Sequence, residues 1–128
     1  MLAVLSWAEI PQEKFTIEVS ISNLKSNDGK LLVGLYSSED AFLSKTFAAE
    51  LGAISNKQST VVFKNIPEGI YAVSYVHDAN DNGKMDTNFM GIPKEDYGCS
   101  NNATGFMGPP KWKDAKFELK SDKSIQIN

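Results

Sequence analysis

The sequence predicts an all-β fold, a single antiparallel β-sandwich of six to seven short strands with one long ordered loop. Three observations support this fold class. Apolar and polar residues alternate over short runs, turn residues recur about every ten positions, and no long amphipathic helix is indicated. The chain of 128 residues fits one domain with a hydrophobic core.

The first strand is predicted at residues 15–24, where one face is apolar and the other polar. The apolar face is formed by Phe15, Ile17, Val19 and Ile21. Asn27-Asp28-Gly29 then supplies a turn, because Asn and Gly tolerate positive φ. Residues 30–36 form the second strand, and we expect the two strands to pair as a hairpin.

The next segment is less regular. Residues 38–43 fit one helical turn with Ser38 as its N-cap. Residues 47–55 combine helix-favouring and strand-favouring residues, and we favour a short edge strand. Asn56-Lys57-Gln58 predicts the turn that follows.

Two further strands flank a tight turn. Residues 59–65 place Val61 and Phe63 on one face of the first of them. Pro67-Glu68-Gly69 predicts a turn in which the glycine adopts the left-handed conformation. Residues 70–77 are apolar on both faces, which predicts a central strand covered on each side.

The long loop is expected at residues 78–111, inserted into a sandwich domain that spans residues 15–128. Loops of this length are uncommon unless they have a function or are disordered. This one carries regularly spaced apolar residues, which argue against simple disorder. Beyond it the alternation resumes at Ala115, Phe117, Leu119, Ile125 and Ile127.

Composition bears on localisation and partners. The net charge is −3 and the lysines are scattered, so we expect no nucleic-acid binding. No apolar run reaches the ~18 residues that a membrane span needs. Residues 1–8 are mostly apolar and end in Ser6-Trp7-Ala8, as at a signal-peptide cleavage site. We therefore expect a signal-peptide remnant at residues 1–8 and export to the periplasm or medium; an ordinary N-terminal strand or a frayed tail is the alternative.

The long loop opens with the spacing of a calcium-binding loop. Alternate oxygen-bearing side chains precede and follow a glycine at the sixth position, as in the first nine positions of an EF-hand loop. The expected Ca²⁺ ligands are Asp78, Asn80, Asn82, the carbonyl of Lys84, and Asp86. The twelfth position, where a bidentate Glu belongs, is Phe89. Another oxygen is therefore needed, and the candidates are Asn88, Glu95 and Asp96.

The same residues can also be explained without a metal, as loop-stabilising side chains. Asp and Asn side chains hydrogen-bond to backbone two residues on and hold irregular loops together as Asx-turns. A transition-metal site is disfavoured, because the chain has one His and one Cys, spaced wrongly for zinc.

His77 and Cys99 are the residues most open to a catalytic interpretation. A hydrolase would use His77 as an acid or base with Asp78, Asp86 or Asp96. We favour instead a packed histidine hydrogen-bonded to a loop carbonyl, because no nucleophile is evident. Cys99 has no basic neighbour to activate it and is expected to be a small buried side chain.

Aromatic residues of the long loop suggest a second alternative. Tyr97, Phe106 and Trp112 could form a glycan- or small-ligand-binding surface. The competing explanation is that the apolar loop residues anchor the loop to the sandwich. We expect the amides of Asn101 and Asn102 to hold the loop together.

A long combined motif resembles the bacterial domain-of-unknown-function family 2141. The matching stretches are Asn65-Ile-Pro-Glu-Gly-Ile-Tyr-Ala-Val73, His77-Asp78-x-Asn80-x-Asn82-Gly83-Lys84-x-Asp86-Thr87-Asn88, Gly91-Ile-Pro93, Glu95, Tyr97-Gly98, Ser100-Asn101-Asn102-Ala103, Gly105 and Gly108-Pro-Pro110. The resemblance implies a small exported β-sandwich and supplies no activity. Cys99 departs from it, since an apolar and often aromatic residue is expected there.

The stretch Pro67-Glu-Gly-Ile-Tyr71 is also similar to one in transthyretin-like and carboxypeptidase-regulatory-like sandwiches. We therefore expect a transthyretin-like or immunoglobulin-like sandwich, without any transfer of function. The transthyretin-like hydrolases of purine breakdown need several histidines, and this chain has one. The expected protein is an exported, non-catalytic sandwich whose calcium-ordered loop presents a surface to a protein or glycan partner.

Overall fold

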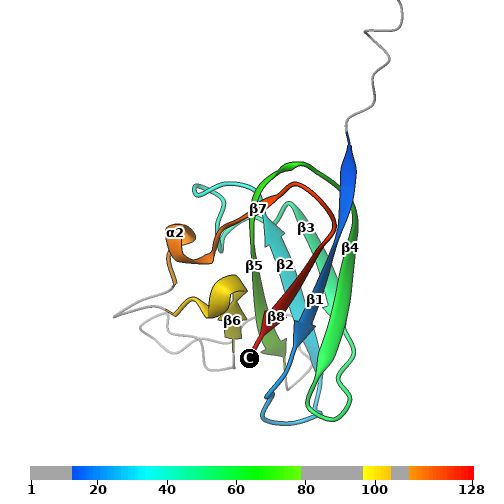
Figure 1. Cartoon of the computed structure of the whole chain (residues 1–128). Helices are drawn as coiled ribbons and strands as arrows, with labels where there is room; N and C mark the ends of the chain where they lie inside the picture. Colours follow the sequence, from blue (N-terminus) through cyan, green and yellow to red (C-terminus); the bar gives the residue numbers. More distant parts are fainter. Residues whose placement is uncertain (1–12, 79–96, 105–109) are drawn as a thin grey trace, which may run out of the picture.

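Two β-sheets packed face to face form the protein (Figure 1). The computed structural model describes residues 13–78, 97–104 and 110–128. The three-stranded sheet has the order β4-β1-β8, formed by β1 (Lys14–Ile21), β4 (Ser59–Pro67) and β8 (Lys123–Ile127). The five-stranded sheet has the order β3-β2-β5-β6, with β7 also paired to β5. Its strands are β2 (Lys30–Tyr36), β3 (Ala48–Gly52), β5 (Gly69–Asp78), β6 (Tyr97–Cys99) and β7 (Phe117–Leu119).

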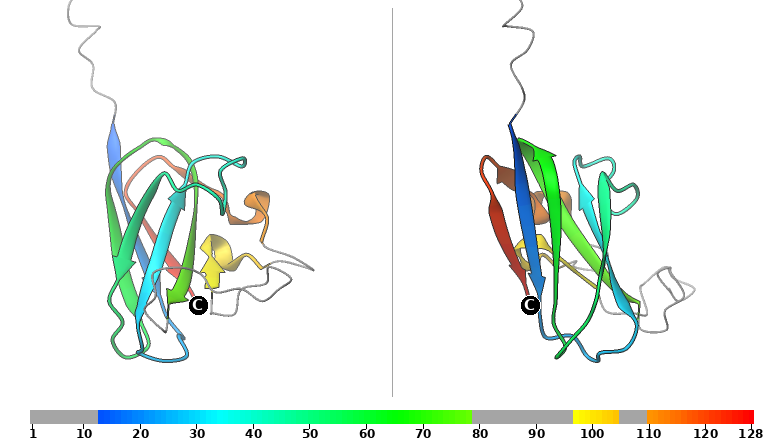
Figure 2. Two further views of the ribbon diagram at one scale, coloured as in Figure 1. Left: turned by 180° about the vertical axis from the view of Figure 1, so that it is seen from behind. Right: turned by 90° about the vertical axis from the view of Figure 1, so that its right-hand side faces the viewer.

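The predicted all-β sandwich is confirmed. Figure 2 shows the two layers edge-on, with β1, β4 and β8 in one of them. The described residues contain eight strands, more than the six to seven expected. Among these described strands, all pairs are antiparallel except β1 with β8, which run parallel. A parallel pair needs a connection that crosses over, and here the whole five-stranded sheet lies between β1 and β8 in the sequence.

The core between the sheets follows the alternation that the sequence shows. Apolar residues of β1 lie fully inside, and every second residue of β2, β4 and β5 faces them. The residues of this core with the lowest exposure are Ile17, Val19, Leu31, Leu35, Val73 and Leu119. Burial of apolar surface is the dominant favourable term in folding, so this inner layer stabilises the sandwich.

The predicted hairpin between β1 and β2 is wrong. β1 pairs with β4 and β8, whereas β2 pairs with β3 and β5. The chain therefore crosses from one sheet to the other between Ile21 and Lys30. Two hydrogen bonds to the turn before β4 hold this crossing. The amide of Leu24 donates to the Lys57 carbonyl, and the Lys57 amide donates to Oδ1 of Asn27.

The connection between β4 and β5 also joins the two sheets rather than forming a hairpin. Pro67 ends β4 and Gly69 begins β5, with a bend at Glu68 between them. Gly69 does not adopt the predicted left-handed conformation, whereas Gly29 does, with φ of 68°. Because β4 and β5 belong to different sheets, the chain does not need the tight reversal that joins two paired strands of one sheet.

Residues 38–43, predicted as one helical turn, lie in a hydrogen-bonded turn between β2 and β3. Oγ of Ser38 accepts a hydrogen bond from the Ala41 amide, as an N-cap would. The segment cannot continue as a helix, because Leu43 adopts φ of 64°. The predicted edge strand after it is confirmed as β3, which pairs only with β2 within the described part of the chain.

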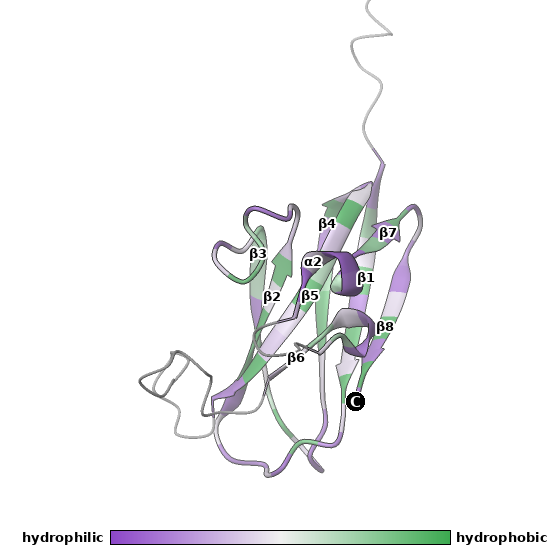
Figure 3. Ribbon diagram, turned by 90° about the vertical axis from the view of Figure 1, so that its left-hand side faces the viewer, coloured by the Kyte–Doolittle hydropathy of each residue, from purple (hydrophilic) through white to green (hydrophobic). Residues whose placement is uncertain are grey.

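β5 is the central strand of its sheet, as predicted. Its residues from Tyr71 to Asp78 are all buried. Core residues cover one face of the strand, and a smaller cluster covers part of the other face. That cluster contains the buried residues Ala72, Cys99 and Ala115, with Phe42, Ala103 and Trp112 packed against them. Figure 3 shows α2 (Trp112–Ala115) in front of the five-stranded sheet on this outer side.

The stretch expected as one inserted loop, residues 78–111, contains regular structure in its described part. Asp78 is the last residue of β5, Tyr97–Cys99 forms β6, and Ser100–Asn102 forms the short 3-10 helix η1. Ala115, expected in a strand, instead ends α2. The strand alternation begins only after it, at β7.

Candidate functional site

The C-terminal end of β5 carries the first predicted calcium ligand. β5 pairs with β2 up to its last residue, so Lys30 lies opposite Asp78 and Leu31 lies opposite His77. The side chain of Asp78 has no exposed surface. A carboxylate in such a place requires a compensating cation and hydrogen bonds, because removing it from water is costly.

Lys30 provides part of that compensation. Its Nζ lies 3.8 Å from Oδ2 of Asp78, and its side chain is 29% exposed. The distance is at the long end for an ion pair, which leaves the carboxylate only loosely held from this side. The pair combines a buried anion with a partly solvated cation.

The turn before β2 reaches the same end of β5. Nε2 of His77 donates a hydrogen bond to the Asp28 carbonyl oxygen over 2.7 Å, between residues 49 positions apart. The Asp28 amide in turn donates to Oγ of Ser26 over 3.2 Å. The Asp28 backbone is thereby held on both sides, while the residue itself is exposed. A second carboxylate is thus carried by a fixed turn next to the strand end that holds Asp78.

The prediction of a packed His77 is confirmed. Only 3% of the residue is exposed, and its ring is bonded to a loop carbonyl, as expected. A general base has to reach the proton that it abstracts. The His77 ring instead serves to join β5 to the β1–β2 connection. The hydrolase interpretation therefore loses its acid–base residue.

The remaining predicted metal ligands lie outside the described residues. These are Asn80, Asn82, Lys84 and Asp86, together with Phe89 at the twelfth position. The further candidates Asn88, Glu95 and Asp96 lie there too. Within the described ranges, no group of three or more His, Cys, Asp or Glu side chains is close enough to hold a metal ion. The calcium site thus stays a prediction, with Asp78 as its described member.

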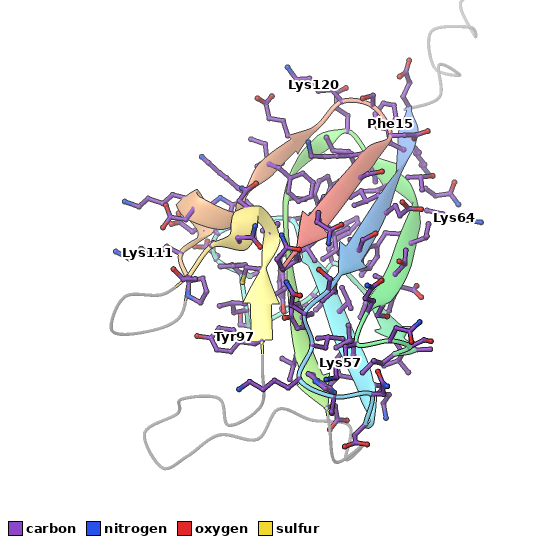
Figure 4. All side chains as sticks on the ribbon, turned by 60° about the horizontal axis from the view of Figure 1, so that its bottom comes forward. Phe15, Lys57, Lys64, Tyr97, Lys111 and Lys120 are labelled. Carbon is purple, nitrogen blue, oxygen red and sulfur yellow. The ribbon has the colours of Figure 1, made fainter. Side chains whose placement is uncertain are left out.

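The aromatic residues proposed as a ligand surface are not brought together in the described part of the structure. Tyr97 is 39% exposed and projects outward from β6 (Figure 4). Trp112 packs edge-on against Phe42, which packs in the same way against Tyr36. Phe106 lies outside the described residues. Trp112 is therefore part of the outer cluster that anchors α2.

The segment after β6 is held by side chains whose role was only partly predicted. Asn101 donates from Nδ2 to the carbonyls of Asp114 and Lys116, and Oδ1 of Asn102 accepts from the Asn128 amide. These bonds confirm the expected role of the amides. Ser100 was not singled out from the sequence; it is fully buried, and its hydroxyl hydrogen-bonds to the backbone of Val73 and Ala115.

Cys99 lies buried in the outer cluster, as expected. Burial raises the pKa of its thiol, and a hydrogen bond from Ser74 acts in the opposite direction with smaller effect. The thiolate is the reactive form, so the folded protein holds this cysteine in an unreactive state. Burial also raises the pKa of the neighbouring Tyr36 hydroxyl, to which Cys99 contributes a smaller rise.

We expect the Cys99 thiol to react at least ~100-fold more slowly with Ellman's reagent in the folded protein than in urea. Raising the pH from about 7 to 9 should speed the reaction of the unfolded chain, whose thiol ionises near its ordinary pKa. The folded protein should gain little, because its thiol pKa is raised. Rapid reaction of one full equivalent without denaturant would contradict this prediction.

Comparison with known proteins assigns the family of the chain. A bacterial family described as "Uncharacterized protein conserved in bacteria (DUF2141)" matches residues 19–128. No curated protein and no solved structure is significantly similar to the chain. Among the described residues, no helix is long and apolar enough to cross a membrane. The match covers the whole sandwich from within β1 onward, and the chain therefore belongs to the bacterial family DUF2141.

Proposed function

We propose that this protein is a non-catalytic β-sandwich that binds Ca²⁺ where β5 ends, and that the ion orders the following segment into a binding or assembly surface. The observation that carries the proposal is the position of Asp78. It is the first residue of the calcium-loop spacing, and its buried carboxylate is fixed at the last position of a central strand. A strand end places a ligand more accurately than a free loop would.

The chemistry of the donor set supports Ca²⁺ over other ions. The predicted ligands are two carboxylates, two side-chain amides and one backbone carbonyl, all of them oxygen donors. Hard cations such as Ca²⁺ prefer such donors, and Ca²⁺ accepts six to eight of them in flexible geometry. Bound at Asp78, the ion would supply positive charge to a carboxylate that has no access to water.

The site needs an oxygen in place of the missing acid at Phe89. The position of the β1–β2 turn favours Asp28 for this role. Its backbone is bonded to His77, the residue before Asp78, and its side chain is free of the sandwich interior. We add this carboxylate to the candidates Asn88, Glu95 and Asp96. With few carboxylates in the loop, affinity should be in the weak range of extracellular calcium modules.

Calcium is expected to raise the melting temperature of EDTA-treated protein. A ligand that binds only the folded state stabilises it by about 2.7 kcal/mol at a hundredfold excess over Kd. Isothermal titration calorimetry with CaCl₂ should give a saturable heat, and differential scanning fluorimetry should show the shift. Magnesium at equal concentration should do much less, because it demands smaller, near-octahedral geometry.

Two variants connect this effect to the proposed ligands. Asp86→Asn and Asp28→Asn should each weaken calcium binding, whereas Asp40→Asn should not, because Asp40 is an exposed acid in the turn before β3. Absence of both heat and thermal shift in the wild-type protein at millimolar calcium would end the metal proposal. An unchanged Kd in Asp28→Asn would remove only that residue from the site.

Export remains part of the proposal, supported by the apolar run at residues 1–8 and its Ser6-Trp7-Ala8 ending. A site of weak affinity is suited to compartments where calcium is abundant. The partner of the surface is proposed to be a protein or a glycan. The partly exposed Tyr97 at the start of β6 is the described aromatic residue best placed to contact it.

A further inference from the structure

β3 forms one edge of the five-stranded sheet (Figure 3). Its residues Ala48–Gly52 all pair with β2 in one unbroken antiparallel register. The strand contains no Lys, no Pro and no bulge, which are features that commonly keep a sheet edge from pairing with another chain. Its one charged residue is Glu50.

The other edges in the described part of the chain are interrupted, covered or short. β4 has a register shift opposite Phe15 and Ile17, and Asn65 within this strand adopts φ of 62°. η1 lies beside β8, and the Asn128 amide after β8 is bonded to Oδ1 of Asn102. β6 and β7 have three residues each. Of these edges, β3 is therefore the one best suited to accept a further strand.

An apolar row crosses the outer face of the same sheet and ends at this edge. Leu51 of β3 lies opposite Leu32 of β2. Leu32 in turn lies opposite Val76 of β5, and Val76 lies opposite Tyr97 of β6. Val76 is buried, whereas Leu51 is 65% exposed, the highest value among the large apolar side chains of the described residues. The row thus runs from the covered middle of the sheet to an exposed leucine at its edge.

We propose that β3 pairs with β3 of a second copy of this chain, antiparallel about a two-fold axis at Leu51. The pairing joins the two five-stranded sheets into one continuous sheet. It sets Leu51 directly against its counterpart, so that the two apolar rows become one. Because the same surface is used on both copies, the assembly closes at a dimer. This inference is independent of the calcium proposal, whose surface follows β5.

The charge of Glu50 selects the axis. A two-fold axis at Glu50 would place two carboxylates directly opposite each other, which destabilises a cross-strand pair. An axis at Leu51 instead places Glu50 opposite Gly52, so like charges do not meet. An axis at Ala49 would set alanine against alanine beside Gly34 and bury little apolar surface at the contact. The axis at Leu51 covers the exposed leucine without opposing charges.

The dimer is expected to be weak. Within β3, only residues 50–52 overlap about this axis, and interfaces below about 1,200 Å² typically belong to transient complexes. We expect a dissociation constant on the order of 0.1–1 mM. The chain is then monomeric when dilute and dimeric where it is concentrated.

Sedimentation equilibrium in EDTA, at loading concentrations up to about 1 mM, measures the association. The weight-average mass of wild type should rise with concentration. Leu51→Lys should weaken dimerisation at least ~tenfold, because it removes the leucine contact and sets two ammonium groups against each other. Val62→Lys on β4 is the matched control and should dimerise as wild type does, since Val62 is also an exposed apolar strand residue. Unchanged melting temperatures verify that both variants fold.

Cysteine cross-linking tests the position of the axis. Directly opposite residues of an antiparallel pair have Cα atoms about 4.5–5.5 Å apart, a separation that a disulfide can span. Leu51→Cys should therefore form a covalent dimer when oxidised with diamide. Ala49→Cys should not, because the two cysteines would be offset by four residues, about 13 Å along the strand. Wild type, whose Cys99 is buried, is the blank.

The outcomes are separate from those of the calcium titration, because no metal is present. Loss of the dimer in Leu51→Lys together with cross-linking of Leu51→Cys supports the proposal. A wild-type chain that stays monomeric at about 1 mM overturns it, and so does a Leu51→Lys variant that dimerises as wild type does. Faster cross-linking of Ala49→Cys than of Leu51→Cys overturns the proposed axis.

Discussion

Asp78→Asn is expected to lower the free energy of unfolding by about 1–3 kcal/mol in EDTA. The substitution keeps the shape of the side chain but removes the negative charge opposite Lys30, whose Nζ is 3.8 Å away. The loss stays below that of leaving a charge buried without its partner, because the Lys30 side chain is partly exposed and can find water. Urea unfolding followed by circular dichroism measures the loss.

A double-mutant cycle identifies the cause of this loss. Combining Asp78→Asn with Lys30→Met removes both charges, so the double variant should lose less stability than the sum of the two single variants. Asp40→Asn, an exposed acid, should stay within about 0.5 kcal/mol of wild type. Additive losses in the cycle would show that the two charges do not stabilise each other. Calcium should also fail to raise the melting temperature of Asp78→Asn if the carboxylate is a ligand.

The sequence predicted the strands better than their pairing. Alternation over β1 and two-sided apolar character over β5 are local properties, and they determined which faces are buried. The partner of a strand is a long-range property. Asn27-Asp28-Gly29 correctly indicated a change of direction, but the same turn chemistry serves a hairpin and a crossing between sheets. The hydrogen bonds between Lys57 and the β1–β2 connection stabilise the crossing between the sheets. No local sequence pattern reveals these bonds.

The candidate site likewise combines residues that local patterns predict with residues that only long-range contacts bring together. The packed His77 was predicted, since it lies at the end of a clear strand, whereas the role of Asp78 as a metal ligand stays a prediction. The positions of Lys30 and Asp28 were not predictable, because only the β2–β5 register and the His77 bond bring them to this end of β5. Ser100 was missed for a related reason. A Ser in a stretch rich in Asn and Gly is typical of a loop, and its burial depends on α2 packing over it.

Ser100→Ala is expected to lower the free energy of unfolding by about 2–4 kcal/mol. The hydroxyl of Ser100 is fully buried; it accepts a hydrogen bond from the Val73 amide over 3.0 Å and donates one to the Ala115 carbonyl. Alanine at this position leaves both backbone groups buried without these partners, and each unsatisfied group costs about 1–3 kcal/mol. Urea unfolding, compared with the exposed control Ser124→Ala, measures the difference.

The location of the damage tests the explanation further. Val73 belongs to the central strand and Ala115 ends α2, so Ser100 joins the outer cluster to the five-stranded sheet. Loss of the hydroxyl should loosen α2 before the sheets separate. In a Trp7→Phe background, the fluorescence of Trp112 should then change at lower urea concentration than the circular dichroism of the strands. Coincident transitions with an undiminished midpoint would contradict this role. A separated first transition would show that the outer cluster, which carries the start of the proposed surface at β6, depends on one buried hydroxyl for its attachment.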